Sequence, residues 1–133
     1  MSKLVVIVQC DNVTKRCSGI WCMTDFYDKI GAFEVYEDDT RYMSMTCGGC
    51  CGNLVAAKFE NLKQKMAKKN IRKEDIVVHL ASCIVSDNSH RTPCPFRMDM
   101  KKILERKGFT VKFGTHISKT AQSRRDAGIY ASW

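Results

Sequence analysis

The chain has 133 residues, of which 44% are hydrophobic and 27% charged, a composition typical of a folded globular protein and unlike that of a disordered one. The first apolar run, Leu4–Val8, is too short for the core of a secretory signal or for a membrane-spanning helix. We therefore expect a cytoplasmic protein, whose eight cysteines are reduced and point to metal binding or thiol chemistry rather than to a disulfide framework.

The net charge of +8 comes from 22 Lys and Arg against 14 Asp and Glu. The lysines concentrate in residues 58–73. Apolar residues recur there at helical spacing, as Val55, Phe59, Leu62 and Met66. The lysines are then the solvated face of an amphipathic helix, and no aromatic residue accompanies them on that face as a nucleic-acid platform would require. We expect neither a membrane nor a nucleic acid as a partner.

The hydrophobic pattern of the first half predicts strands and helices in alternation. Residues 3–9 are a continuous β-branched run, of the kind that is buried on both faces of a parallel sheet. A helix over 20–31 ends at Gly31, and the segments 32–38 and 41–46 are then predicted as strands.

The alternation continues in the second half. The pattern predicts a helix over 53–70, a strand over 74–82, a helix over 95–108 and a strand over 109–115. The polar tail 118–133 is expected to form a short helix packed by Ile129, Tyr130 and Trp133. This order predicts a single three-layer α/β domain with a mostly parallel, roughly five-stranded sheet, doubly wound as in flavodoxin.

A soft metal ligand follows each of four predicted strands. These residues are Cys10, Cys47, Cys83 and His116. Because parallel strands end at the same edge of a sheet, we expect the four side chains to share a crevice there, near a switch in strand order. Cys17 and Cys94 lie in connecting segments that leave the same edge and can fold back over it.

The stretch TCGGCCG, residues 46–52, joins three cysteines to three glycines. Glycine allows the backbone to bend closely around a metal ion or cluster. Cys47 and Cys50 precede the predicted helix 53–70, whose positive end would stabilise thiolates. A Cys-x-x-Cys pair alone is compatible with zinc, iron–sulfur or redox chemistry, and the further cysteines at the same edge favour a metal.

Four residues have no clear ligand role in the pattern. Cys22 lies inside an amphipathic helix and is expected to be a core residue. Cys51 is compatible either with a third ligand in the turn or with packing. His79 is expected to be a buried, hydrogen-bonded histidine of a strand, and the polar segment around His90 indicates no role.

Several short motifs together resemble those of a known family. They are RCSG (16–19), GAFEVY (31–36), CGGC (47–50), HLASC (79–83), CPF (94–96) and GTH (114–116). Through them residues 3–116 resemble the CGGC domain, named for its central motif.

This resemblance implies a metal-binding α/β domain over residues 1–116, with 117–133 as a C-terminal tail. It implies zinc, with an iron–sulfur cluster also compatible. By motif position the implied ligands are Cys10, Cys17, Cys47, Cys50, Cys83, Cys94 and His116, with His79 as a further candidate. The sequence departs from the family at Cys51, where proline is expected.

Two thiol-dependent activities are the alternatives. Cys10 and Arg16 resemble the phosphate loop of low-molecular-weight phosphatases and thiol-dependent arsenate reductases, although no glycine lies between them to help the loop amides converge on an anion. Cys47 and Cys50 resemble the pair of a disulfide oxidoreductase, although neither proline of the chain obviously supplies the cis-proline that such folds use. We therefore expect Zn²⁺ or an iron–sulfur cluster organised by Cys47 and Cys50.

Overall fold

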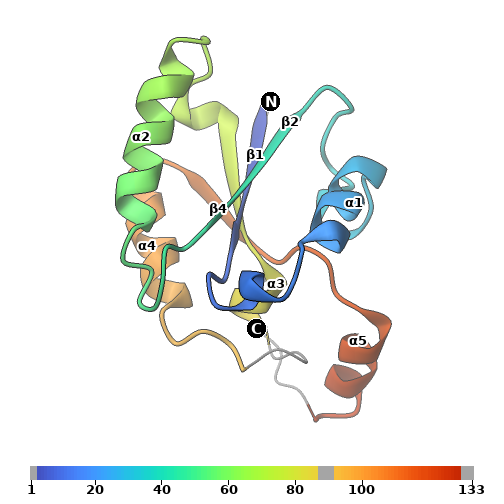
Figure 1. Ribbon diagram of the computed structural model, residues 1–133. Helices are drawn as coiled ribbons and strands as arrows, with labels where there is room; N and C mark the ends of the chain where they lie inside the picture. Colours follow the sequence, from blue (N-terminus) through green and yellow to red (C-terminus); the bar gives the residue numbers. More distant parts are fainter. Residues whose placement is uncertain (1–2, 87–91, 130–133) are drawn as a thin grey trace.

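A parallel sheet forms the centre of the computed structural model, which describes residues 3–86 and 92–129 (Figure 1). Its four strands are β1 (Leu4–Gln9), β2 (Arg41–Thr46), β3 (Ile76–Leu80) and β4 (Thr110–Phe113). They lie in the order β2-β1-β3-β4, with Val6 of β1 beside Met43 on one side and Val78 on the other. The prediction of an α/β fold with a parallel sheet is confirmed.

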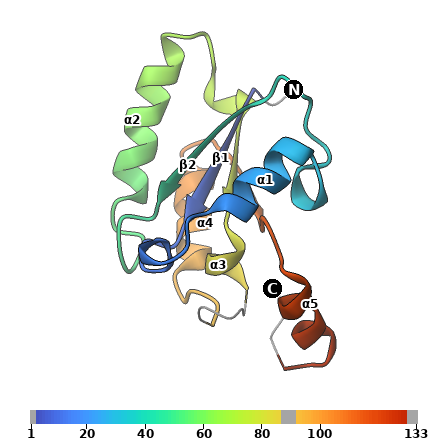
Figure 2. The same cartoon turned by 45° about the vertical axis from the view of Figure 1, so that its right-hand side comes forward.

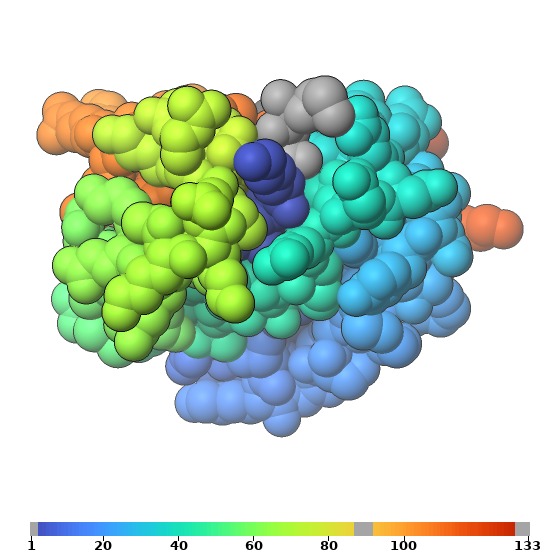
Figure 3. All heavy atoms as spheres, turned by 90° about the horizontal axis from the view of Figure 1, so that it is seen from above, coloured from blue at the N-terminus to red at the C-terminus, as the bar shows by residue number. Residues whose placement is uncertain are grey.

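Helices cover both faces of this sheet (Figure 2). The α-helices are α1 (Ile20–Asp28), α2 (Val55–Ala67), α3 (Ser82–Val85), α4 (Arg97–Arg106) and α5 (Lys119–Asp126), and the 3-10 turns are η1 (Val13–Lys15), η2 (Gly31–Phe33) and η3 (Lys73–Asp75). Seen from above, side chains of α2 and α1 lie on opposite sides of the start of β1 (Figure 3). None of the helices in the described ranges is long and apolar enough to cross a bilayer.

The side chains of β1 alternate between two cores, which explains its unbroken apolar sequence. Val6 packs with Phe59 of α2 and Leu104 of α4, whereas Ile7 packs with Phe26 of α1. All five side chains are fully buried, and burying a side chain of this size contributes about 1.5–3 kcal/mol. A strand that serves two cores has no polar face.

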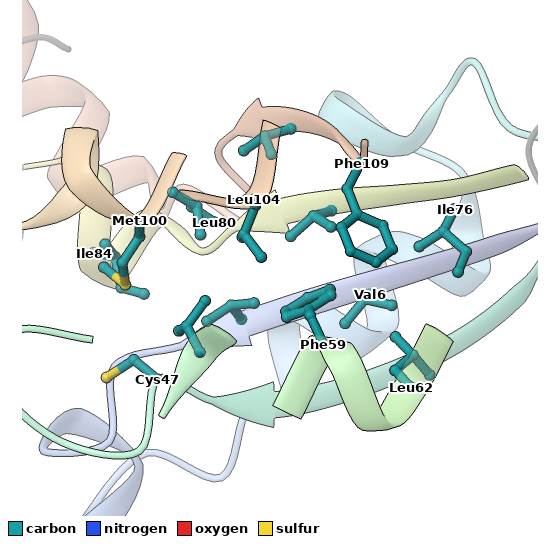
Figure 4. Packing of buried hydrophobic residues seen from close by; sticks show 14 of the residues in the cluster. Val6, Cys47, Phe59, Leu62, Ile76, Leu80, Ile84, Met100, Leu104 and Phe109 are labelled. Carbon is teal, nitrogen blue, oxygen red and sulfur yellow. The ribbon is translucent and has the colours of Figure 1, made fainter. Parts of the chain in front are cut away.

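The core between the sheet and helices α2 and α4 reaches the carboxyl edge of the strands (Figure 4). At its centre the rings of Phe59 and Phe109 meet edge to face, with centroids 5.1 Å apart. Cys47 lies at one end of the same cluster and is 7% exposed. This cysteine is therefore a core residue as well as part of the glycine-rich turn.

The strand predicted over 32–38 is wrong. Residues Gly31–Phe33 form η2, and turns and bends follow it. Phe33 and Tyr36 are both buried against the α1 face of the sheet. Residues three apart point to the same side in such turns but to opposite faces in a strand, so the turn is what allows both rings to be buried together. In the described residues the sheet has four strands rather than roughly five.

His79 is the buried, hydrogen-bonded histidine that its place in a strand predicts. It is 1% exposed. Its Nδ1–H donates to the Gly114 carbonyl at 2.9 Å, which leaves Nε2 to accept from the Tyr36 hydroxyl at 2.6 Å. Burial lowers the pKa of His79 and raises the pKa of Tyr36 to about 12, so both side chains are neutral. The pair fastens the 32–38 segment to the sheet.

The end of the chain differs in detail from the prediction. Helix α5 forms in the tail and buries Ala121. Ile129, which was expected to pack this helix, is 68% exposed. Tyr130 and Trp133, the other expected packing residues, lie outside the described residues, as does His90.

A cysteine-lined cavity at the carboxyl edge of the sheet

A cavity of about 430 Å³ lies beyond the carboxyl ends of β1, β3 and β4. Helix α1, which follows β1, covers one face of the sheet, and α4, which follows β3, covers the other. The boundary between these two strands is therefore the switch in strand order, where α/β sheets bind ligands. The β1–α1 connection, α3, the β4–α5 connection and α5 all contribute to the wall. A cavity therefore lies at the expected edge, and of the four residues expected to share it, Cys83 and His116 line it whereas Cys10 and Cys47 do not.

Three cysteines from distant parts of the sequence line this cavity: Cys17, Cys22 and Cys83. A fourth, Cys10, is buried next to Cys83, and its backbone N–H donates to Cys83 Sγ at 3.4 Å. Burial raises the pKa of the Cys83 thiol to about 12, and the neighbouring thiols of Cys10, Cys22 and Cys17 act in the same direction. Cys83 is therefore a neutral thiol at physiological pH.

A pair of hydroxyl residues holds the strand ends together beneath the thiols. The backbone N–H of Ser82 donates to Thr115 Oγ1 at 3.2 Å, and the backbone N–H of Thr115 donates to Ser82 Oγ at 3.0 Å. Cys22 Sγ lies 3.1 Å from the same Thr115 hydroxyl. This contact ties α1 to the ends of β3 and β4, so Cys22 belongs to the cavity wall as well as to the core where the helical pattern placed it.

The connection from β1 to α1 runs close over the end of β1 because of one glycine. Gly19 has φ +81°, and a Cβ there would lie 2.6 Å from Gln9 Nε2. A side chain at this position would strain the backbone, and the flexible end of Gln9 would have to move. Gly19 therefore allows Cys17 and Cys22, on either side of it, to approach Cys83.

His116 lies at the rim of the cavity and is held by two residues of α1. Its Nδ1 lies 2.8 Å from Asp25 Oδ2, and its ring stacks on Trp21 with centroids 5.6 Å apart. A carboxylate can only accept, so the imidazole donates from Nδ1 and keeps Nε2 available. Asp25 and Trp21 were not among the site residues predicted from the sequence. Their spacing of four residues, which places them on one helix face, is the signal that could have done so.

The rest of the wall is basic and rich in hydroxyl groups. Arg16 and Arg125 line the cavity, and no carboxylate residue does so among the described residues. Its hydroxyl residues are Thr14, Ser18, Ser82, Ser86, Thr115 and Ser118. The cavity therefore combines soft thiols with groups that bind anions.

Comparison with known proteins identifies the family. Residues 4–116 match the CGGC domain. The chain belongs to the CGGC domain family. A similar protein is an uncharacterized protein of Methanocaldococcus jannaschii, 28% identical over 120 residues that cover 84% of this chain and 85% of the relative. No solved structure matches the chain. The CGGC domain match ends at His116, so Arg125 and the rest of α5 add to the cavity from outside it.

The motif that names the CGGC domain does not line this cavity in the described structure. Cys47 continues the side of β2 that faces α2, and its Sγ lies 3.5 Å from the Gly49 carbonyl. Gly48 then reverses the chain with φ +80°, and Cys50 is exposed. The two thiols of the motif thus have different environments.

The predicted helix over 53–70 directly follows the CGGC turn, but in the structure further turns separate the two. Cys50 to Leu54 form turns, and α2 starts at Val55. Cys51 is exposed with φ +69°, a value that proline, with its φ near −65°, does not adopt. The positive end of α2 therefore does not act directly on Cys47.

The remaining predicted ligand of the CGGC domain, Cys94, lies close to the chain that carries Cys83. Its backbone N–H donates to the Ile84 carbonyl at 2.7 Å, and it packs against the same core as Cys47. All eight cysteines are free thiols. Across residues 3–86 and 92–129, no three side chains of Cys, His, Asp or Glu converge closely enough to hold a metal ion.

The loop after Cys10 does not have the form of a phosphate loop. The backbone N–H groups of Thr14 and Cys17 donate to the carbonyls of Cys10 and Val13, at 3.0 and 2.9 Å. The Arg16 N–H likewise donates to Val13. Because these amides are used within η1, they do not converge on an anion. Cys10 is also only 5% exposed, which argues against a role as a nucleophile.

Proposed function

We propose that this CGGC domain protein binds a thiophilic metal ion through Cys17, Cys22, Cys83 and His116. The observation that carries the proposal is that these four side chains, brought from three separate segments, line one cavity. Three thiolates and one imidazole are a donor set that zinc takes in tetrahedral sites. Zn²⁺ held by this set would link the β1–α1 connection, α3 and the β4–α5 connection.

The contact between His116 and Asp25 supports this donor set. A histidine that binds a metal commonly donates its other ring N–H to a carboxylate, which fixes the ring and raises its basicity. Here Asp25 accepts from Nδ1 at 2.8 Å, which directs the lone pair of Nε2 away from the carboxylate. The stacking of Trp21 on the ring further limits its rotation.

The thiols fit the donor set chemically, although they do not converge on one point in the described residues. A cysteine side chain can move its Sγ between staggered rotamers without a change in the backbone. Cys83 carries its proton at neutral pH, and the thiolate is the form that binds a metal. Metal uptake would therefore release protons and strengthen as the pH rises.

An iron–sulfur cluster is the second candidate, and Cys10 favours it. With Cys10 in contact with Cys83, four thiols lie at this edge of the sheet, the number of thiolates that clusters commonly take. Either cofactor agrees with a cytoplasmic protein, a location that the eight free cysteines support.

The test is the metal content of protein purified without oxygen, measured by elemental analysis and by competition with a chromophoric chelator. We expect about one zinc per chain, because one closed site needs four ligands. Absorbance near 400 nm with stoichiometric iron would select the cluster instead. Cys17→Ser and Cys83→Ser should lose the metal. Asp25→Asn should weaken its binding by about 10- to 100-fold because it removes only the orienting carboxylate.

Matched controls separate this cavity from the CGGC turn. Asp28→Asn alters an exposed carboxylate on the same helix, and Cys50→Ser alters an exposed thiol of the turn. Both variants should retain the metal with unchanged affinity. If the metal is lost with Cys50→Ser and kept with Cys83→Ser, the proposed ligand set is refuted. The absence of bound metal in every preparation would refute the proposed function itself.

A further inference from the structure

The cavity is larger than a metal site requires. Its volume of about 430 Å³ lies within the range of small-molecule pockets, about 300–1,000 Å³. One water molecule takes up only about 30 Å³ in the liquid. A small organic molecule therefore fits beside the thiols, in the part of the cavity between the β1–α1 connection and α5.

Among the described residues that line the cavity, the charged side chains are those of two arginines. Arg16 comes from the β1–α1 connection and Arg125 from α5, so two different elements each contribute an arginine to the wall. Arg125 Nη1 donates to Gln122 Oε1 at 3.1 Å, which holds the guanidinium to its own helix. Such planar donor groups pair with carboxylate and phosphate oxygens.

An apolar surface lies next to the arginines. Trp21 and Ile20 line the cavity while 62% and 50% exposed, and Ile117 lines it from the β4–α5 connection. Small-molecule pockets are typically lined by apolar and aromatic side chains together with a few polar groups that orient the ligand. The Trp21 ring is already oriented by its stacking on His116.

We propose that this cavity binds a small organic anion, a carboxylate or a phosphate monoester, whose acid group pairs with Arg16 and Arg125 and whose uncharged body lies against Trp21. The site shares a wall with the proposed metal ligands but uses other residues. It goes beyond the proposed function and does not depend on it. The net charge of +8 also attracts anions to the molecule.

Trp21 provides the probe for the test. In a Trp133→Phe background it is the only tryptophan of the chain, because the sequence has two. Full-length protein with chelator present is titrated with benzoate and with phenyl phosphate, and the neutral compounds benzamide and phenol serve as controls. We expect saturable quenching of Trp21 fluorescence by one or both anions and none by the neutral compounds. The two anions distinguish a carboxylate from a phosphate ligand.

Variants then test the position of the acid group. Arg125→Gln and Arg16→Gln should each weaken anion binding by at least about tenfold, since each removes a charged hydrogen-bond partner. Arg124→Gln, which changes a neighbouring arginine of α5 outside the cavity wall, should not. Saturable binding that is unchanged in both Arg125→Gln and Arg16→Gln would overturn the proposal, as would the absence of quenching by either anion. Because the titration is done with chelator present, neither result depends on whether the protein binds a metal.

Discussion

The cavity and the CGGC turn both contain cysteines, but they arrange them in opposite ways. In the turn, Cys47 and Cys50 are close in sequence, but one is buried in the core and the other is exposed. In the cavity, Cys17 and Cys83 are far apart in sequence and line the same wall. Closeness along the chain therefore does not place these two thiols in the same environment, whereas the shared carboxyl edge of parallel strands places distant cysteines in the wall of one cavity.

The largest expected difference between the two regions is in thiol reactivity. The thiolate is the reactive form, and the pKa of Cys83 is raised to about 12, so very little of it is ionised at pH 8. Cys50 is exposed to reagent. Alkylation with iodoacetamide at pH 8, followed by peptide mass spectrometry, should show Cys83 reacting at least about 100-fold more slowly than Cys50.

The same experiment can contradict the proposed difference between the cavity and the CGGC turn. Similar rates for Cys50 and Cys83 would mean that the cavity does not isolate its thiols from solvent and base. Cys47, which is buried although it belongs to the CGGC motif, provides an internal control and should also react slowly.

A second, smaller effect concerns the shape of the turn. Gly48 has φ +80°, and a Cβ there would lie 2.5 Å from Leu54 Cβ. Gly48→Ala should therefore lower the free energy of unfolding by about 3 kcal/mol, from backbone strain and crowding together. Gly31→Ala is the matched control, because its φ is +58° with no atom near the added Cβ, and it should cost about 1 kcal/mol. Urea denaturation measures both, and equal losses would show that the contact with Leu54 does not shape the turn.

The smallest expected effect is on the pH dependence of stability. It comes from His79, which belongs neither to the cavity lining nor to the CGGC turn. Burial lowers the pKa of His79 below its ordinary value of 6.5, so the unfolded chain binds this proton more readily than the folded one. Its contribution to stability is therefore fully present above pH 6.5 and is lost as the pH falls below that value.

His79→Gln removes the titrating group and keeps a hydrogen-bonding side chain. The free energy of unfolding, measured by urea denaturation between pH 8 and pH 5, should decline less steeply for this variant than for the unchanged protein. An identical slope would show that His79 titrates normally.

Much of the fold follows from local patterns. The β-branched run of β1, the apolar spacing of α2 and the order of strands and helices predict a parallel α/β sheet, and the structure has one. The segment 32–38 was misread because its alternating apolar residues suit a strand, while the burial of Phe33 and Tyr36 on one side of the sheet requires a turn. No local pattern distinguishes these two cases.

The residue order shows that soft ligands follow the strands, and a parallel sheet then gathers thiols at its carboxyl edge. Which of them share a cavity depends on long-range packing, which places Cys22 in the wall through its contact with Thr115, sets Asp25 against His116 and keeps Cys50 apart. The physical reason is that strand order and helix packing fix which connections face each other, and these depend on contacts between residues distant in sequence.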